Sequence, residues 1–332
     1  MSLTAFFYAR SPIMTTSLIA FGANLGNRAE SLEQACLELS AHEEITVVAR
    51  SQHYQTSPIG GPAGQEDFLN AAILVDTSLS PQQLLARLQE IEIQLGRRRQ
   101  QRWDQRPIDL DLLLYDTLTR EDDQLQIPHP HMAFRRFVLE PAVEIAPTLV
   151  HPTSGWTIQQ LHAHLDRAKN YLALVGPAGS GKTDIARAVC EQLGGYLALT
   201  STLAPTHDKP EVAEEQLIEQ RLQELETVSQ QIEGATEATR MFAISDFWLN
   251  QSFAYLQEQL DPAAQEHFLA AWETTVSQAL QPKLRILLEP DGKPTPLSDL
   301  AQQPLQGPLL RLTDCRPQAV IEEVSAAILS MQ

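Results

Sequence analysis

Hydrophobic and polar positions alternate in several short segments of the first half of this 332-residue chain. Apolar side chains three and four residues apart, with Pro81 early and Gly96 at the end of the second run, predict amphipathic helices at 28–41 and 81–96. Alternation or a high content of β-branched residues predicts strands at 17–22, 44–54, 68–77 and 107–116. The order strand, helix, strand, strand, helix, strand predicts an α+β domain, a ferredoxin-like sandwich of the split βαβ type.

The pattern restarts further along the chain. Residues 171–175, YLALV, form a continuous apolar run that predicts a buried strand, and a glycine-rich turn and an amphipathic helix follow. Strand, turn and helix in this order are typical of an α/β domain with a parallel sheet. We therefore predict two domains, 14–166 and 167–332. Residues 1–13 precede the first strand-like run and are expected to be a disordered leader.

Composition narrows the class of protein. The chain contains no run of eighteen apolar residues, which excludes an ordinary spanning helix, and its three cysteines are too widely spaced for a disulfide framework or a zinc site. A reducing, cytoplasmic location is the natural expectation. The formal net charge of −18 argues against nucleic acid as the main partner, because phosphate contacts need a basic footprint. The first lysine is Lys169, so anion binding before it rests on arginine.

An unusual pair of carboxylates occupies the fourth predicted strand. Asp109 and Asp111 alternate with Leu110, so both point to one face, where they repel each other and lose hydration. An isolated pair of this kind is most simply a solvated strand end. Here, however, five arginines lie within a dozen residues of it: Arg97, Arg98, Arg99, Arg102 and Arg106. Mg²⁺ bridges carboxylates to substrate phosphates and guanidinium groups match phosphate oxygens, so the composition predicts a nucleoside triphosphate site without a P-loop.

A family resemblance rests on ordered segments of this half. IAFGANLGNR, YQTSPIG, DFLNAA, RWDQRPIDLDLLL, IPHPHM and RRFVLEPAVEIAP resemble the 6-hydroxymethyl-7,8-dihydropterin pyrophosphokinases from Ser17 to about Leu165. The resemblance implies transfer of a diphosphate from ATP to a pterin alcohol in folate biosynthesis, with AMP leaving. It also implies two Mg²⁺ ions held by Asp109 and Asp111.

Other roles are implied position by position. Arg97 and Arg106 join the two aspartates as catalytic residues, and the pterin pocket is expected at Thr56, Pro58, Ile59, Phe68, Asn70 and Phe137. Contacts to ATP are expected from Arg99, Arg102, Trp103, His129 and Arg135. The loop before Trp103 is shorter than in some relatives and lacks lysine, which leaves the contacts of Arg99 and Arg102 open. His129 and His131 also suggest a metal site, but no third ligand lies nearby in the sequence.

The second domain carries a phosphate-loop motif. GPAGSGKT, from Gly176 to Thr183, fits the pattern GxxxxGK[ST] between a predicted strand and helix. Backbone N–H groups of the loop, with Gly179 and Gly181, are expected to bind phosphates, Lys182 to reach the outer phosphates and Thr183 to hold Mg²⁺. A structural glycine turn without a ligand is the plain alternative.

The rest of this domain resembles the deoxynucleoside kinases more loosely. MFAISDFWLNQ and LRILLEP follow that family in order, which implies a phosphate-side or metal-side role for Asp246 and a nucleoside pocket near Gln216, Arg221, Phe242 and Trp248. Two departures weaken the implied activity. The base glutamate after the second strand is replaced by Thr200 and its neighbours, and the lid has no arginine before Arg311.

Three alternatives therefore stay open for the second domain. It is a nucleotide-binding module without kinase activity, a second active kinase in a bifunctional enzyme, or a regulatory nucleotide sensor that forms homodimers. A kinase without lid arginines loses several kcal/mol of transition-state stabilisation, so the first alternative is favoured.

Overall fold

The computed structural model describes residues 14–61, 64–97, 105–122, 124–200, 210–234, 241–257, 272, 274–290, 295–303 and 306–332. The predicted leader, residues 1–13, lies outside them. Two compact units make up the chain: unit 1 comprises Met1–His129 and Glu140–Pro147, and unit 2 comprises Pro130–Leu139 and Thr148–Gln332. The predicted domain boundary after residue 166 stays a prediction.

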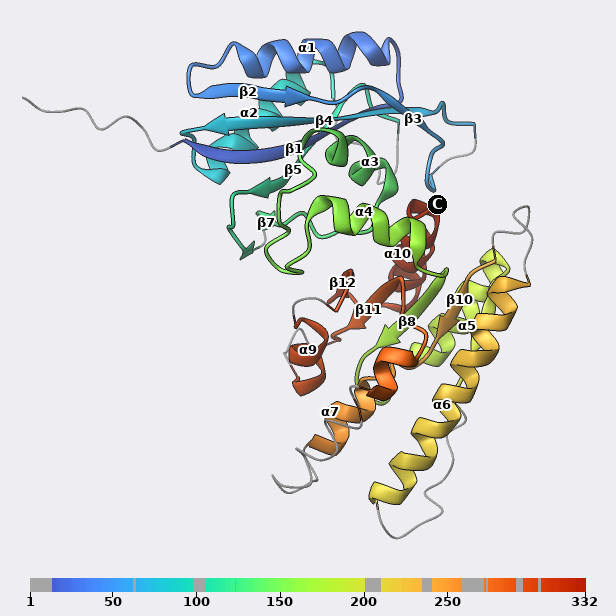
Figure 1. Ribbon diagram of the computed structural model, residues 1–332. Coiled ribbons are helices and arrows are strands. Elements are labelled where there is room, and N and C mark those ends of the chain that lie inside the picture. The colour runs from blue at the N-terminus through green and yellow to red at the C-terminus, as the bar shows by residue number, and fades with distance from the viewer. Residues whose placement is uncertain are drawn as a thin grey trace, which may run out of the picture. The chain divides into compact units, whose positions relative to one another are not determined.

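Unit 1 is built on an antiparallel sheet, as predicted. Its main strands run in the order β2-β4-β1-β5, and β3 pairs with β4 (Figure 1). Helices α1 and α2 follow β1 and β4 along the chain and cover one face of the sheet. The elements are β1 (Thr15–Ala23), α1 (Arg28–Ser40), β2 (Ile45–Arg50), β3 (Tyr54–Thr56), β4 (Phe68–Thr77), α2 (Pro81–Gln94), β5 (Asp109–Tyr115), β6 (Arg120–Glu121) and β7 (Gln126–Ile127).

Local sequence signals begin and end these helices. Ser80 caps α2 in a capping box with Gln83, and Pro81 occupies the first turn, where its missing N–H costs nothing. Gly96 follows the helix with a φ of 92°, a conformation that glycine adopts without strain. After this turn, the backbone N–H of Arg97 donates to the carbonyl of Glu92 at 2.9 Å, so Arg97 lies against the end of the helix.

The predicted strand at 44–54 is wrong in its middle. The strand is divided into β2 and β3 near Ser51, although the backbone N–H of Ser51 still donates to the carbonyl of Ala72 at 3.0 Å. Its hydroxyl oxygen accepts a hydrogen bond of 2.9 Å from the N–H of Ala72, in place of a backbone carbonyl. The interruption separates β3, which carries Thr56, from the rest of the edge strand.

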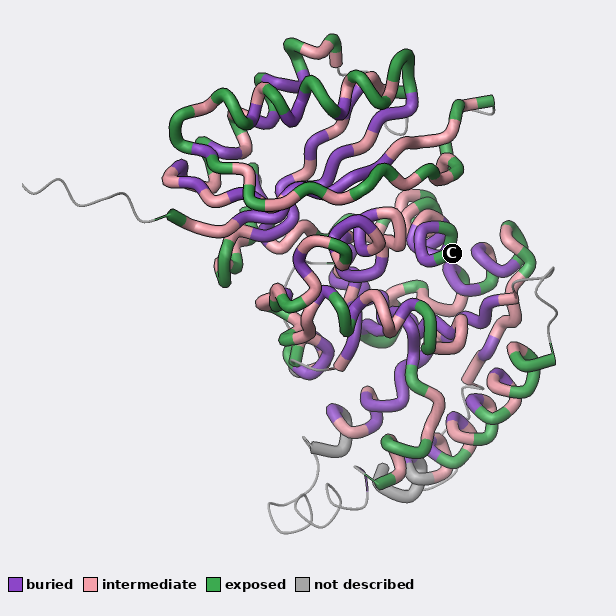
Figure 2. Tube along the Cα trace, turned by 45° about the horizontal axis from the view of Figure 1, so that its top comes forward, coloured by how far each residue is buried: buried purple, intermediate pink, exposed green. Residues whose placement is uncertain are grey.

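The core of unit 1 lies between the helices and one face of the sheet. Leu32 and Leu39 of α1 and Leu84 and Leu88 of α2 pack against Ile19 and other inward side chains of the strands, and all five are at most 1% exposed. Figure 2 shows how buried positions recur along these strands. The odd-numbered side chains of β1 face the helices, so its even-numbered positions line the opposite face.

Unit 2 contains a five-stranded parallel sheet in the order β12-β11-β8-β10-β9, as predicted for an α/β domain. Its apolar strand β8 lies in the middle and is buried along its whole length (Figure 2). The elements are α4 (Ile158–Arg167), β8 (Tyr171–Val175), α5 (Lys182–Leu193), β9 (Tyr196–Ala198), α6 (Pro210–Glu233), β10 (Ala243–Ser245), α7 (Gln251–Gln257), β11 (Leu284–Leu288), α9 (Pro296–Ala301), β12 (Leu309–Leu312) and α10 (Pro317–Ser330). Helix α3 (Arg136–Ile145) spans the division between the units.

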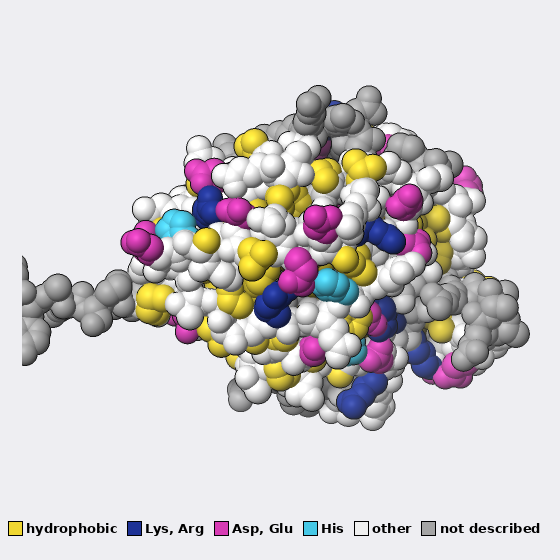
Figure 3. All heavy atoms as spheres, turned by 90° about the horizontal axis from the view of Figure 1, so that it is seen from above, with side chains coloured by type: hydrophobic (Ala, Val, Ile, Leu, Met, Phe, Trp, Pro, Cys, Tyr) yellow, Lys and Arg dark blue, Asp and Glu magenta, His cyan; other side chains and the backbone are white. Residues whose placement is uncertain are grey.

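On the side of the molecule shown in Figure 3, charged side chains of one sign do not gather into a patch. Acidic, basic and hydrophobic side chains are interspersed there rather than gathered by kind. Within the described residues, no helix combines the length and the apolar character needed to cross a bilayer.

Candidate active site

The sheet of unit 1 presents a row of polar side chains on the face opposite its helices. Gly22 of β1 is the register partner of Asn70 on β4 and of Asp109 on β5. One step along, Ala20 is the partner of Ala72 and Asp111. Directly paired residues of antiparallel strands project to the same face, so Asn70, Asp109 and Asp111 share one surface. The predicted metal ligands of β5 and a predicted pterin residue of β4 are thereby brought to one face, on either side of β1.

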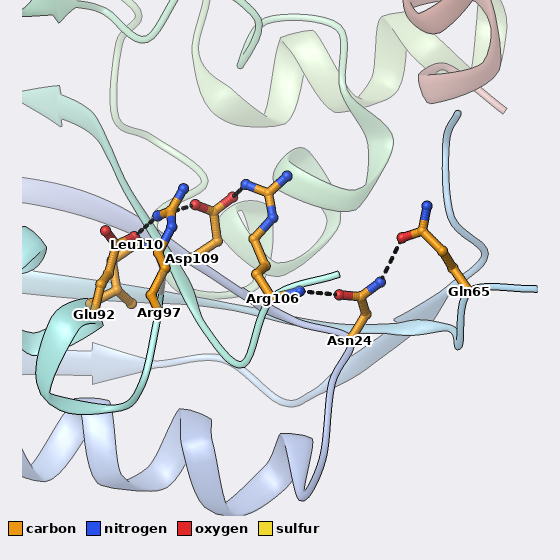
Figure 4. A network of polar contacts seen from close by, with 7 residues as sticks. All are labelled: Asn24, Gln65, Glu92, Arg97, Arg106, Asp109 and Leu110. Carbon is orange, nitrogen blue, oxygen red and sulfur yellow. Dashed lines mark hydrogen bonds and ion pairs between the residues drawn. The ribbon is translucent and has the colours of Figure 1, made fainter. Parts of the chain in front are cut away.

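Asp109 is held between two arginines (Figure 4). Its Oδ1 lies 2.6 Å from Nη1 of Arg97, and its Oδ2 accepts a 2.6 Å hydrogen bond from Nη1 of Arg106. Arg97 lies in the turn after α2, and Arg106 lies in the segment before β5. The beginning and the end of the connection between these two elements therefore each contribute an arginine to this carboxylate. In the structure, these two arginines supply the positive charge next to Asp109.

Glu92 extends this network and was missed by the sequence analysis. It is 6% exposed, and its Oε1 accepts a hydrogen bond of 2.7 Å from the N–H of Leu110 while also pairing with Nη1 of Arg97 (Figure 4). Strand β5 lies at the sheet edge, so Glu92 satisfies one of its outward N–H groups. The available signal was a glutamate inside the apolar stripe of α2, next to Ile91.

Burial shapes the protonation of these acids. Burial raises the pKa of Glu92 to about 7, against the opposing effects of the Leu110 N–H and of Arg97. Burial, and then the neighbouring Asp111, raise the pKa of Asp109, while Arg106 and Arg97 oppose the rise. The charges of two guanidinium groups thus face three carboxyl groups, and added positive charge favours the ionised form of Asp109.

Asn24 supports the arginine side of the site. Its side chain is fully buried; Oδ1 accepts a 2.9 Å hydrogen bond from the N–H of Arg106, and Nδ2 donates to Oε1 of Gln65 at 3.0 Å (Figure 4). The backbone N–H of Asn24 also donates to the carbonyl of Arg106. This residue lies in the quoted segment IAFGANLGNR, yet a buried asparagine after a strand gave no sign of its distant partner.

The carboxylates fit a magnesium site. Asp109 and Asp111 offer oxygen ligands from one face of β5, and both are partly exposed. Among the described residues, no group of three or more His, Cys, Asp and Glu side chains forms a metal cage. Mg²⁺ characteristically takes one or two carboxylates and completes its shell with water and substrate phosphates. The donor set therefore suits an ion that is shared with a phosphate substrate.

Two predicted pterin residues contact each other. Asn70, 5% exposed, donates from Nδ2 to Oγ1 of Thr56 at 2.8 Å, and Phe68 is the register partner of Thr56 across β3 and β4. Pro58 and Ile59 lie in the loop after β3 and are partly exposed. Because Nδ2 of Asn70 donates to Thr56, the Oδ1 atom of Asn70 is directed toward Gly22. Five of the six predicted residues thus belong to β3, its loop and β4.

The predicted ATP residues are only partly described. His129 donates its N–H to the carbonyl of Leu113 at 2.9 Å, so it is anchored to β5. The guanidinium carbon of Arg135 lies 5.6 Å from the centroid of the Phe137 ring, so a predicted ATP residue and a predicted pterin residue are in contact within unit 2. Arg99, Arg102 and Trp103 lie outside the described residues, and their predicted roles stay predictions.

The second motif forms a turn between β8 and α5 in unit 2. Gly179 and Gly181 have φ values of 78° and 80°, and a Cβ on Gly176 would lie 3.0 Å from the carbonyl oxygen of Leu288. Lys182 begins α5 and donates from Nζ to the carbonyls of Gly176 (2.9 Å) and Pro177 (2.7 Å). Burial lowers the pKa of Lys182. The glycines therefore serve the turn, and the lysine lies back over it.

Asp246 joins this turn to the next strands. It accepts hydrogen bonds from Oγ1 of Thr183 at 2.6 Å and from the N–H of Thr200 at 3.1 Å. A cavity of about 320 Å³ lies beside Thr200 and is lined also by Arg221, Glu224 and Phe247. Arg221 is 5% exposed and pairs with Glu214 at 3.3 Å. The motif, the acid and a pocket thus lie near the ends of β8, β9 and β10.

Other residues implied by the kinase resemblance have structural surroundings. A Cβ on Gly195 would lie 2.3 Å from the Phe242 ring, so Phe242 packs directly on that backbone. Trp248 is 2% exposed and lies under the guanidinium group of Arg285, 5.3 Å from Cζ to the ring centroid. Arg311 donates from Nε and Nη2 to Oε2 of the buried Glu289. These contacts favour core roles for the two aromatic residues.

Comparisons with known proteins agree on the first part of the chain. The model of the 7,8-dihydro-6-hydroxymethylpterin-pyrophosphokinase (HPPK) family matches residues 18–147. A 2-amino-4-hydroxy-6-hydroxymethyldihydropteridine pyrophosphokinase of Methylorubrum extorquens is 43% identical over 153 residues, 46% of this chain and 95% of that protein. One from Synechocystis is 40% identical over 189 residues, 57% of this chain and 89% of that protein.

Similarity over the whole chain is weak. A crystal structure of wild-type HPPK-DHPS from Plasmodium falciparum aligns with 89% of this chain and 72% of that chain, at 12% identity and a TM-score of 0.36. A TM-score this low does not establish a shared architecture.

Proposed function

This chain belongs to the 7,8-dihydro-6-hydroxymethylpterin-pyrophosphokinase family and is an enzyme of that class, and we propose that Asp109, Asp111, Arg97 and Arg106 carry its reaction. The substrates are ATP and 6-hydroxymethyl-7,8-dihydropterin, and the products are the pterin diphosphate and AMP. The single observation that supports this assignment is the carboxylate of Asp109 held between two guanidinium groups, with Asp111 on the same face.

The reaction forms one bond and breaks one. The hydroxyl oxygen of the pterin alcohol attacks the β-phosphorus of ATP. The bond between the β-phosphorus and the oxygen that bridges it to the α-phosphorus breaks, and AMP leaves with that oxygen and the electron pair of the bond. No protein group is proposed as a base in this reaction, and the hydroxyl proton passes to solvent. Mg²⁺, two ions in our proposal, neutralises charge on the phosphate oxygens when bound at Asp109 and Asp111.

The arginines have two roles in this proposal. Before substrate binds, Arg97 and Arg106 neutralise Asp109, which lies beside Asp111. When the triphosphate binds, the two guanidinium groups turn to its oxygens, because one guanidinium group can donate two parallel hydrogen bonds to a phosphate. Positioning and charge neutralisation of this kind supply most of the catalysis in phosphoryl-type transfers.

Binding of the pterin is assigned to the row beside this site. Asn70, oriented by Thr56, reads an edge of the ring, and Phe68 and Phe137 stack on its faces. Pro58 and Ile59 complete the pocket, and His129, Arg135, Arg99, Arg102 and Trp103 contact ATP. The support for these roles is the family membership together with the proximity of Thr56, Asn70 and Gly22.

For unit 2 we propose a nucleotide-binding module of the P-loop kinase type that lacks kinase activity. Support comes from the parallel sheet with the motif after its middle strand, and from the hydrogen bond between Thr183 and Asp246. Thr200 in place of a base glutamate and Arg311 paired with Glu289 argue against phosphoryl transfer. A second active kinase in a bifunctional enzyme and a regulatory nucleotide sensor that forms homodimers are the alternatives.

Product analysis tests both proposals. Purified protein is incubated with Mg-ATP and the pterin alcohol, and AMP is separated from ADP. Pterin-dependent AMP is expected; its absence would contradict the function proposed for unit 1. A panel of deoxynucleosides is then added, for which no additional ADP is expected. Nucleoside-dependent ADP would instead identify unit 2 as an active kinase.

A further inference from the structure

The segment of residues 130–139, which carries Arg135 and Phe137, is packed inside unit 2. Five of its side chains are at most 5% exposed, namely Met132, Ala133, Phe134, Val138 and Leu139. The proposed function assigns Arg135 to ATP and Phe137 to the pterin. The orientation of these two residues therefore depends on the elements of unit 2 that hold the segment.

An ion pair joins this segment to the end of helix α4. Nη1 of Arg136, which lies between the two assigned residues, is 2.9 Å from Oδ1 of Asp166 in the last turn of α4. The side chain of Asp166 is 51% exposed, and an exposed pair contributes little stability by itself. The pair can orient the segment only if the turn that carries Asp166 is itself fixed.

Lys283 fixes this turn from the sheet of unit 2. It directly precedes β11, and its N–H donates to the carbonyl of Tyr171, the first residue of β8, at 2.7 Å. Its Nζ donates to the carbonyl of Leu165 at 2.8 Å and to Oδ1 of Asn170 at 2.7 Å. Nε2 of His164 lies 2.9 Å from the carbonyl oxygen of Lys283. The ammonium group thus caps one of the carbonyls that the end of α4 leaves without a helical partner.

A lysine is a costly residue at this position. Lys283 is 5% exposed, and a buried ammonium group costs free energy that an apolar side chain avoids. Burial, and then the positive charge of Arg136, lower the pKa of Lys283 to about 8, while Asp166 opposes the fall. Lys283 therefore acts on the last turn of α4 by its hydrogen bond and by its charge beside the ion pair.

The last helix of the chain holds the other end of the segment. Nε2 of His131 lies 3.8 Å from Oε2 of Glu323 on α10, and the two side chains are 19% and 13% exposed. The His131 ring also meets the ring of the buried Phe134 edge to face, with 5.9 Å between the centroids. Elements of the C-terminal half thus contact the segment before Arg135, and through α4 they support it after Arg135.

We infer that Lys283 is a positioning residue for the pyrophosphokinase reaction. It fixes the last turn of α4, and the pair of Asp166 with Arg136 transmits that position to the segment that carries the assigned substrate residues. The parallel sheet of unit 2 then serves the first reaction without any kinase activity of its own. This inference rests on the function proposed for unit 1.

The first test compares Lys283→Met with wild type and with Lys169→Met as a matched control, all in the full chain. Methionine keeps an unbranched apolar stem and removes the ammonium group. The ammonium group of Lys169 donates instead to Ser229 and Glu233 of α6. KM values for the pterin alcohol and for ATP, kcat and Tm are measured. For Lys283→Met we expect both KM values to rise about threefold or more with kcat within about twofold of wild type, and Lys169→Met should keep the wild-type KM values.

A second set of variants separates positioning from folding. Asp166→Asn removes the ion pair at a half-exposed position and should raise the same KM values. Combined with Lys283→Met it should add less than about twofold, because both changes act through one turn. Glu323→Gln should also raise the KM values, whereas Glu322→Gln, its exposed neighbour, should not.

The outcomes distinguish this inference from the proposed function. Wild-type KM values in Lys283→Met overturn the inference and leave the function standing. A lower kcat at unchanged KM values also overturns it, because a smaller folded fraction gives that result. Independent, multiplicative effects of Lys283→Met and Asp166→Asn overturn it as well. If Lys283→Met does not fold, unchanged KM values in Asp166→Asn and Glu323→Gln decide against the inference. If wild type does not convert the pterin, the proposed function itself fails.

Discussion

Glu92 and Asp109 are joined through a single guanidinium nitrogen, Nη1 of Arg97. One acid comes from α2 and the other from β5, and the arginine comes from the turn that ends the helix. Glu92 also accepts the N–H of Leu110, so the same carboxylate fixes the edge strand and the arginine. The position of the candidate catalytic arginine therefore depends on a buried acid that is not among the residues proposed to bind the substrates.

We expect Glu92→Gln to weaken the pH dependence of stability. The unfolded chain releases the Glu92 proton near pH 4.5, while burial raises its pKa to about 7 in the folded chain. Between these values the folded state binds more protons, so the free energy of unfolding falls as pH rises, by about 3 kcal/mol from this group. Glutamine keeps an acceptor for Leu110 and removes the titration. Urea unfolding at pH 5, 6, 7 and 8 should show a smaller fall than wild type; an identical fall would falsify the role of Glu92.

Replacing Asp109 by asparagine should abolish most activity with little loss of fold. The amide keeps the shape of the side chain but loses the charge that holds Mg²⁺ and pairs with both arginines. We expect kcat/KM to fall by more than about 100-fold. Asp116→Asn is the matched control, because Asp116 is an exposed acid in the turn after the same strand, with a φ of 47° that asparagine also accepts. Near-normal turnover in Asp109→Asn would exclude the metal assignment.

Asn24→Ala should destabilise unit 1. The substitution leaves the N–H of Arg106 without the acceptor Oδ1, and an unsatisfied buried N–H costs about 1–3 kcal/mol. Because Arg106 then loses its anchor, kcat/KM should fall as well. Gln65→Ala removes the other hydrogen bond of Asn24 at a less buried position and should cost less. Denaturant midpoints of the two variants provide the comparison, and equal midpoints would argue against the anchoring role.

Removing Lys182 should remove one nucleotide site. Its ammonium group lies over the turn after β8, where phosphates are proposed to bind. Titration of a non-hydrolysable ATP analogue into wild type should give two sites per chain, and one in Lys182→Ala. Arg187→Ala, an exposed position on the same helix, should keep both. A single site in wild type contradicts nucleotide binding by unit 2. In the same variant, altered pterin turnover favours regulation, whereas unaltered turnover favours a separate role.

Much of the fold was predictable because it is encoded locally. The capping box of Ser80 and Gln83, the apolar stripe of α2 and the run YLALV each specify their element within a few residues. The alternation that put Asp109 and Asp111 on one face is likewise a property of β5 alone. The division of the strand at 44–54 was not predictable, since it depends on Ser51 meeting Ala72 on another strand.

The sequence by itself determined the classes of element, the antiparallel and parallel sheets, and the aspartate pair with arginines nearby. It could not choose which arginines meet the pair, because that depends on where the turns after α2 and before β5 return. Only the tertiary structure decided that Arg97 and Arg106 hold Asp109, that Glu92 lies behind Arg97, and that Asn24 supports Arg106. The register that puts Gly22 between Asn70 and Asp109 joins three strands far apart in the chain, and such pairing is fixed by the packing of the whole sheet.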